Sequence, residues 1–163
     1  MSFSRPSLHL VPAPAEPAPE VLFCGHCGEA PPTPMAARSR VCALCGLGVV
    51  ISAREDVAPS PGGSFLVVDR QLKLCGLSRA AEDLLQVVEP AAVHRHINEF
   101  LEPADAEAAA ADALVLSITE SASGGAPVQS IFVRPTGEYG VRYAARVGSC
   151  GPPQGALIVL DTV

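Results

Sequence analysis

Four of the six cysteines stand in two matched pairs that are separated by fourteen residues. Each pair has the Cys-x-x-Cys spacing, which lets one tight turn present two sulfurs, and the glycine after each second cysteine permits that turn. Two such turns supply four thiolates, the closed tetrahedral set that holds structural Zn²⁺ with Zn–S distances near ~2.3 Å. The predicted metal ligands are Cys24, Cys27, Cys42 and Cys45.

Over residues 21–52 this arrangement resembles a zinc ribbon. A segment of this size cannot bury enough apolar surface to fold alone, and zinc binding would supply on the order of 10 kcal/mol or more. A site made only of cysteines leaves no open position for a substrate water, so we expect a structural metal rather than a catalytic one. Iron of the rubredoxin type stays open as an alternative, although Phe23 is the one aromatic residue that would shield it. We expect His26, inside the first pair, to be a turn residue that faces solvent.

The remaining chemistry points away from catalysis and from nucleic acid. The sequence shows no paired carboxylates and no Ser/His/Asp arrangement. Two matched cysteine pairs fit a thioredoxin-type redox centre badly. The net charge of −6 argues against binding to phosphate backbones or anionic membrane surfaces. We therefore predict that the protein is not an enzyme.

The same sequence indicates a cytoplasmic protein. No apolar run reaches the ~18–20 residues that would span a bilayer. The N-terminus lacks the basic patch, apolar core and cleavage site of a signal peptide. Cysteines that are paired for metal, in a chain without a secretory signal, fit a reducing compartment.

Composition divides the chain into four parts. Residues 1–20 contain five prolines and no periodic apolar pattern, which predicts a disordered tail. The zinc ribbon at 21–52 follows, with a short strand expected at Val49–Ile51. Residues 53–63 are rich in proline and glycine and read as a linker. The last part, 64–163, is the predicted main domain.

The main domain begins with a strand, a turn, a second strand and a capped helix. Phe65–Val68 is an apolar run, and the alternation over Leu72–Cys75 predicts a half-buried strand. Ser78 is a good N-cap. The residues Ala81, Leu84, Leu85 and Val88 would form one helix face.

Helices and three strands complete the main domain. We expect one or two short helices within Val93–Leu101 and an alanine-rich helix over Pro103–Ser117. Three strands are then predicted at Val128–Arg134, Tyr139–Gly148 and Ala156–Asp161.

This order of elements resembles a PAS domain, a family of intracellular sensor and interaction modules. The resemblance rests on Asp69 closing the first strand, on INEFLEPAD (Ile97–Asp105) and on the closing GALIVLDTV (Gly155–Val163). It implies an α+β fold: a five-stranded antiparallel PAS-like sheet with helices on one face, preceded by the zinc ribbon.

The resemblance also suggests a cofactor site. His94 and His96 stand where some PAS relatives carry a haem-ligating histidine, and the alternative is two polar residues on an exposed helix. The Asn-Cys-Arg-Phe stretch of blue-light flavin relatives is missing, which argues against a covalent flavin switch. We expect Cys75 and Cys150 to be ordinary thiols.

These observations predict a cytoplasmic signalling or regulatory protein. Its PAS-like part would sense a small ligand or mediate protein interaction or dimerisation, and its zinc ribbon would be an interaction module. The partner would be another protein or a second copy of the chain. The alternative is a DNA-binding transcription regulator with the ribbon as reader, which the charge disfavours. The ligand of the PAS-like part, the output partner and the oligomeric state are left open.

Overall fold

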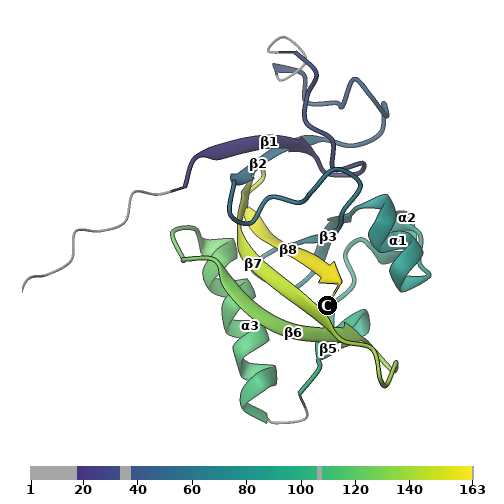
Figure 1. Ribbon diagram of the computed structural model, residues 1–163, viewed down its shortest axis with the longest axis vertical. Helices are drawn as coiled ribbons and strands as arrows, with labels where there is room; N and C mark the ends of the chain where they lie inside the picture. Colours follow the sequence, from purple (N-terminus) through teal and green to yellow (C-terminus); the bar gives the residue numbers. More distant parts are fainter. Residues whose placement is uncertain (1–17, 34–37, 106–107, 163) are drawn as a thin grey trace, which may run out of the picture.

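The computed structural model describes residues 18–33, 38–105 and 108–162 of the chain. Within them the protein is mainly β, with one curled antiparallel sheet and few helices (Figure 1). The strands are β1 (Glu20–Cys24), β2 (Val50–Arg54), β3 (Ser64–Val68), β4 (Leu74–Leu77), β5 (Leu101–Pro103), β6 (Gln129–Pro135), β7 (Tyr143–Gly151) and β8 (Gly155–Thr162). The helices are α1 (Arg79–Leu85), α2 (Glu89–Ala92), the 3₁₀ helix η2 (Ile97–Glu99) and α3 (Ala108–Ser123).

The long strand β7 connects the two ends of the sheet. The strand order is β1-β2-β7-β8-β3-β4, and β6 also pairs with β7 while β5 pairs with β6. Tyr143–Val147 of β7 pair with β6, whereas Cys150 and Gly151 pair with Ala53 and Ser52 of β2. One edge of β7 is therefore shared between β6 and the hairpin β1–β2.

The predicted five-stranded sheet with helices on one face is wrong. The sheet has eight strands, because the β1–β2 hairpin pairs with β7 and extends the sheet instead of standing before it. The short strand β5 adds to the edge of β6. The helices form no continuous layer: α3 packs against β7 and β8, while α1 and α2 lie at the β3–β4 end (Figure 1).

Apolar side chains are buried on both faces of the sheet. Along β3, Leu66 and Val68 belong to one cluster, and Phe65 and Val67 belong to the other, as the alternation of a strand requires. The first cluster lies between the sheet and the helices. The second is covered by the β1–β2 hairpin and the loop after β2, and it contains Phe23, Ile51, Ala53, Val57, Phe65, Val67, Cys150, Leu157 and Val159.

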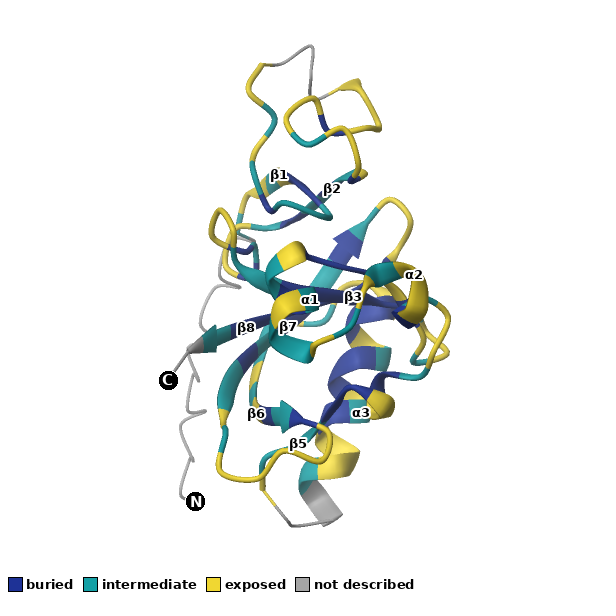
Figure 2. Ribbon diagram, turned by 90° about the vertical axis from the view of Figure 1, so that its right-hand side faces the viewer, coloured by how far each residue is buried: buried dark blue, intermediate teal, exposed yellow. Residues whose placement is uncertain are grey.

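The burial pattern differs along the chain. In Figure 2, β3 and the inner face of α3 are mainly buried, whereas the loops that precede β2 are mainly exposed or half-buried. The division into a zinc ribbon, a linker and a main domain stays a prediction. Hydrogen bonds nevertheless connect the predicted parts, since Ala53 pairs with Cys150 and the amide of Glu55 donates to the carbonyl of Pro19.

The helix caps and helix ends in the structure agree with the sequence-based predictions at some positions and differ at others. Ser78 is confirmed as the N-cap of α1, because its side chain accepts a hydrogen bond from the amide of Ala81. The helix ends at Leu85, where Gln86 takes a left-handed conformation, so the exposed Val88 is not on its apolar face. The long helix α3 covers Ala108–Ser123, whereas Pro103, where a helix was predicted to start, is the last residue of β5.

The predicted disordered tail falls mainly outside the described residues. Only residues 18–20 of it are described, and Glu20 is the first residue of β1. Among the described residues, no helix is both long and apolar enough to span a membrane.

Candidate metal centre

The structure brings the four predicted ligands together. The sulfurs of Cys24, Cys27, Cys42 and Cys45 all lie within 4.8 Å of one another. Cys24 Sγ is 3.6 Å from Cys45 Sγ, and Cys27 Sγ is 3.9 Å from Cys42 Sγ. A tetrahedral zinc site with bonds of about 2.3 Å requires sulfurs separated by about 3.8 Å. The donor set therefore fits a tetrahedral thiolate site.

Backbone amides point at three of the sulfurs. His26 N and Cys27 N lie 3.3 and 3.5 Å from Cys24 Sγ, and Leu44 N lies 3.4 Å from Cys42 Sγ. Gly48 N lies 3.5 Å from Cys45 Sγ. These N–H groups stabilise thiolates by donating to them, which makes the turns suited to charged sulfur.

We call the turn that carries Cys24 and Cys27 the first knuckle and the turn that carries Cys42 and Cys45 the second knuckle. The second knuckle is closed by a short antiparallel pairing. Cys42 N donates to the carbonyl of Gly48, and Val50 N donates to the carbonyl of Arg40, with a bridge between Val41 and Val49. The first knuckle is joined to this pairing because Gly25 N donates to the carbonyl of Val49. The ligand-bearing loops are therefore held together by backbone hydrogen bonds as well as by any metal.

The first knuckle also contacts the rest of the protein. The carbonyl of His26 accepts from Arg79 N at the start of α1, at 2.9 Å, and the carbonyl of Cys27 accepts from Gly62 N at 3.3 Å. The ring of Phe23 meets the ring of Phe65 edge to face, with centroids 5.6 Å apart. The metal-binding turns thus rest on β3 and on the N-terminus of α1.

The thiols of the metal-free cluster differ in acidity. Burial raises the pKa of Cys24 to about 12. Burial acts in the same direction at Cys45, but the amides of Gly48 and Leu47 and the neighbouring sulfurs outweigh it and lower that pKa to about 6. Burial raises the pKa of Cys27. A bound metal would replace the remaining thiol protons, so metal binding to this cluster releases protons.

His26 lies in the turn of the first Cys-x-x-Cys pair, as expected, but it is only partly exposed to solvent. Its side chain is half-buried, and its Nδ1 is buried without a hydrogen-bond partner in the described structure. The other two cysteines lie outside the cluster. Cys75 is exposed on β4, whereas Cys150 is buried on β7, and burial together with the charge of Cys75 raises the pKa of Cys150 to about 12.

The histidines suggested for haem lie between α2 and η2. His96 Nδ1 accepts a hydrogen bond from Asn98 N, at 3.3 Å, and caps η2. The exposed His94 has a positive φ of 70°. The lone pair on Nδ1 of His96 is therefore engaged in the fold, and haem ligation by either residue stays a prediction.

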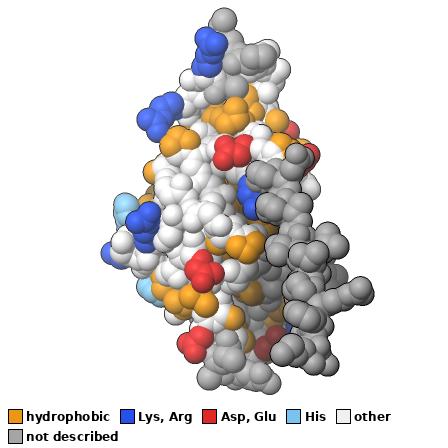
Figure 3. Space-filling view, turned by 90° about the vertical axis from the view of Figure 1, so that its left-hand side faces the viewer, with side chains coloured by type: hydrophobic (Ala, Val, Ile, Leu, Met, Phe, Trp, Pro, Cys, Tyr) orange, Lys and Arg blue, Asp and Glu red, His pale blue; other side chains and the backbone are white. Residues whose placement is uncertain are grey.

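Large apolar side chains are exposed around the second knuckle. Val41, Leu44, Leu47 and Val49 are 45–74% exposed, within a stretch of nine residues. Figure 3 shows hydrophobic and basic side chains at the end of the molecule to which the knuckles belong. Packing among the residues that the structure describes does not account for this concentration of exposed apolar surface.

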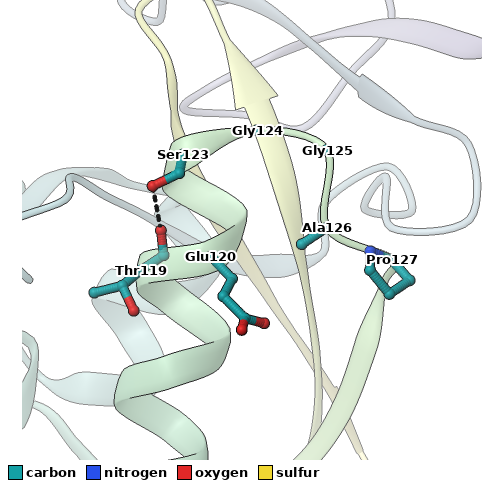
Figure 4. Close-up of a pocket in the computed structure, with 7 residues that line it drawn as sticks. All are labelled: Thr119, Glu120, Ser123, Gly124, Gly125, Ala126 and Pro127. Carbon is teal, nitrogen blue, oxygen red and sulfur yellow. Dashed lines mark hydrogen bonds between the residues drawn. The ribbon is translucent and has the colours of Figure 1, made fainter.

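A separate hollow lies at the C-terminal end of α3 (Figure 4). Ser123 Oγ donates to the carbonyl of Thr119, and the carboxylate of Glu120 points away from this hydroxyl and accepts from the amide of Gln129. The hollow therefore contains no activated nucleophile.

Comparison with known proteins identifies no family. No family model matches this sequence, and no curated protein matches it.

Proposed function

We propose that the four-cysteine cluster is a structural zinc site in a regulatory protein that is not an enzyme and that acts by binding a partner. The observation that carries the proposal is the closed set of four sulfurs within 4.8 Å of one another, with the pairs Cys24–Cys45 and Cys27–Cys42 near the tetrahedral separation. Such a set leaves no coordination position for a substrate or an activated water. The zinc would then fix the shape of the loops that carry the exposed apolar residues.

The choice of zinc over iron rests on the surroundings of the cluster. Thiolate tetrahedra accept either metal, so the donor set alone does not distinguish them. Cys45 is only half-buried, and Leu44 and Leu47 beside it are exposed. A redox-active iron centre is favoured by a shielded site, whereas zinc does not change oxidation state and tolerates an open one.

A sensing role is a second proposal. Residues 64–162 contain two strands, three short helical elements, the short strand β5, helix α3 and three strands, so β5 interrupts the helices in the predicted order. A cavity of about 320 Å³ beside the knuckles gives a small ligand a place to bind. A ligand would signal only if it bound two arrangements of the protein with different affinity.

The metal assignment can be tested by analysis and by cobalt substitution. The purified protein should contain one zinc per chain, measured by elemental analysis. The Co²⁺-substituted protein should show the absorption of a tetrahedral thiolate site, and added azide should leave that spectrum unchanged because no position is open. A spectrum that azide changes would indicate an open, catalytic-type metal site and would overturn the proposal.

A further inference from the structure

A cavity of about 320 Å³ lies between the two knuckles and strands β3 and β4. Its volume is in the range of pockets that hold a small ligand. Most of the side chains in its wall are apolar, namely Leu47, Val49, Ile51, Val67 and Pro153. The cavity therefore suits the apolar body of a small molecule, and we call it the knuckle cavity.

A single carboxylate reaches the cavity from helix α2. Gly76 of β4 pairs with Val67 of β3, so the two residues lie on the face of the sheet that carries the second apolar cluster. A Cβ built on Gly76 would lie 3.1 Å from Glu89 Oε1, and both residues line the cavity. The carboxylate of Glu89 thus lies over the backbone of Gly76, where the missing side chain leaves room for it.

The carboxylate of Glu89 has no counterion in the part of the chain that the structure describes. Its Oε1 accepts from Leu77 N at 3.3 Å, and none of the described basic side chains lies within ion-pair distance of it. The residues that line the cavity include no arginine and no lysine, and the other polar side chains among them are His26, Cys75 and Cys150. A half-buried carboxylate without a counterion is costly, so a cation in the cavity would gain energy by pairing with it.

The metal centre adds negative charge on the knuckle side of the cavity. Gly48 lines the cavity, and its backbone lies directly against Cys24 Sγ. Four thiolates around one Zn²⁺ carry about two negative charges in total. Cys24 is fully buried, so little water screens this charge at the cavity wall. Both sources make the electrostatic potential in the cavity negative, which favours cations and disfavours anions.

We infer that the knuckle cavity binds a small organic cation, namely a protonated primary amine with a compact apolar body. The ammonium group donates charge-assisted hydrogen bonds to the carboxylate of Glu89, which has lone pairs left after it accepts from Leu77 N. The apolar body contacts Ile51 and Val67 in the cavity wall. The inference rests on the proposed function, because zinc-bound thiolates supply part of the negative charge, and it names the class of ligand for the sensing role.

The test compares three probes of nearly equal shape on the zinc-loaded full chain at pH 7. They are cyclohexylmethylamine, which is protonated, cyclohexylmethanol, which is neutral, and cyclohexanecarboxylate, which is an anion. NMR titration should show that the amine binds at least about tenfold more tightly than the alcohol, and that the carboxylate binds more weakly than the alcohol. The amide signals of Gly76 and Leu77, next to Glu89, should shift, whereas that of the distant Thr136 should not.

A charge-removing variant tests the role of Glu89. Glu89→Gln keeps an oxygen that accepts from Leu77 N but removes the negative charge. Its preference for the amine over the alcohol should fall below about threefold, while the alcohol should bind as it does to the wild type. The matched control is Glu138→Gln, which removes the same charge from an exposed turn residue between β6 and β7 and should leave all three affinities unchanged.

Several results would overturn the inference. They are equal affinity for the amine and the alcohol, tighter binding of the carboxylate, an unchanged preference in Glu89→Gln, or an equal loss in Glu138→Gln. Zinc analysis of each sample separates this inference from the proposed function. A chain with one zinc that binds none of the probes refutes the cation site alone. A chain without zinc that still prefers the amine refutes the structural metal site and supports the cation site.

Discussion

The backbone of Gly48 lies directly against the sulfur of Cys24. A Cβ built on Gly48 would overlap Cys24 Sγ and would come within 2.7 Å of His26 Cβ and 2.8 Å of His26 N. Real Cβ atoms do not approach backbone this closely, so no residue with a side chain fits here without moving the first knuckle. Gly48 therefore sets how closely the two pairs of ligands can approach one metal ion.

The first prediction follows from this contact. Gly48→Ala should displace Cys24 Sγ from the tetrahedron and weaken zinc binding by about tenfold or more, which corresponds to at least about 1.4 kcal/mol of binding free energy. Zinc transfer to a chromogenic chelator measures the change. The matched control is Gly46→Ala, where a Cβ would meet nothing within 4 Å and only the φ of 68° opposes it. Equal zinc affinity in the two variants would contradict the prediction.

Removal of the metal should also speed up amide hydrogen exchange outside the ligand-bearing loops. Arg79 N and Gly62 N donate to the carbonyls of His26 and Cys27, which belong to the first knuckle. If chelation loosens this knuckle, both amides lose their acceptors and should exchange with solvent at least about tenfold faster. Hydrogen exchange followed by NMR, with and without a strong chelator, measures this effect.

A distant amide supplies the control for the chelation experiment. Thr136 N donates to the carbonyl of Phe100, on the far side of the main domain from the knuckles. Its exchange rate should stay the same after chelation. Faster exchange at all three amides would mean that the whole domain unfolds without the metal, and unchanged exchange at Arg79 and Gly62 would mean that the knuckle holds its shape unaided.

The sequence predicted what depends on neighbours in the chain. The Cys-x-x-Cys spacing placed the four ligands, because two residues between cysteines fix the separation of their sulfurs locally. The N-cap at Ser78 was equally local, since the capping bond reaches only to Ala81. Strands β3, β6 and β8 were found within a few residues from their apolar runs.

The features that were missed depend on distant partners. No strand was predicted at Glu20–Cys24, although Val21 and Phe23 are good strand formers, and the segment becomes β1 through its pairing with β2. The pairing of Ala53 with Cys150 spans almost a hundred residues, and its register cannot be read from either segment alone. The prediction that Val88 lies on the apolar face of the helix was wrong because it placed the end of the helix too late. Gln86 takes a left-handed conformation and ends the helix at Leu85, although the apolar pattern in the sequence continues to Val88. The sequence shows that the second knuckle contains the apolar residues Val41, Leu44, Leu47 and Val49, but it does not show that their side chains are exposed.

The aromatic contact between Phe23 and Phe65 tests whether the hairpin and the main domain unfold together. Both rings are buried, and they meet edge to face across the boundary between the predicted parts. A double-mutant cycle with Phe23→Leu and Phe65→Leu should give a coupling of about 0.5–1.5 kcal/mol in the free energy of unfolding. Urea denaturation of the four proteins measures it.

A pair on opposite faces of the sheet serves as the reference for this cycle. Leu114 of α3 is buried in the first cluster, whereas Phe23 belongs to the second. The effects of Phe23→Leu and Leu114→Ala should add within about 0.5 kcal/mol. Zero coupling between Phe23 and Phe65 would show that the hairpin unfolds separately from the main domain.

Thiol reactivity separates a structural cluster from a redox enzyme. In the zinc-loaded protein only Cys75, which is exposed, should react with Ellman's reagent within minutes. Cys150 is buried and its pKa is raised to about 12, so at pH 8 only about one molecule in ten thousand carries its thiolate. The four ligand thiolates should react after chelation, and Cys150 should react only on unfolding. Cys75→Ser should abolish the fast reaction, and a second fast thiol in that variant would favour redox chemistry.

The hydroxyl of Ser78 connects three segments of the main domain. It accepts from Ala81 N at 3.2 Å and from Phe65 N at 3.0 Å, and it donates to the carbonyl of Gly63 at 2.9 Å. The side chain is only 1% exposed, so water cannot replace these bonds. Ser78→Ala removes a helix cap and leaves the buried amide of Phe65 without a partner. We expect a loss of about 2–4 kcal/mol in the free energy of unfolding, measured by urea denaturation.

Two substitutions show whether the loss comes from the hydrogen bonds. Ser123→Ala removes an exposed hydroxyl that donates only to the carbonyl of Thr119, so it should cost less than about 0.5 kcal/mol. Ser78→Thr keeps a hydroxyl at the same position and should restore most of the stability that Ser78→Ala loses, less the cost of fitting one methyl group into a packed site. If Ser78→Thr were as unstable as Ser78→Ala, packing at this position rather than the shared hydroxyl would join β3, β4 and α1.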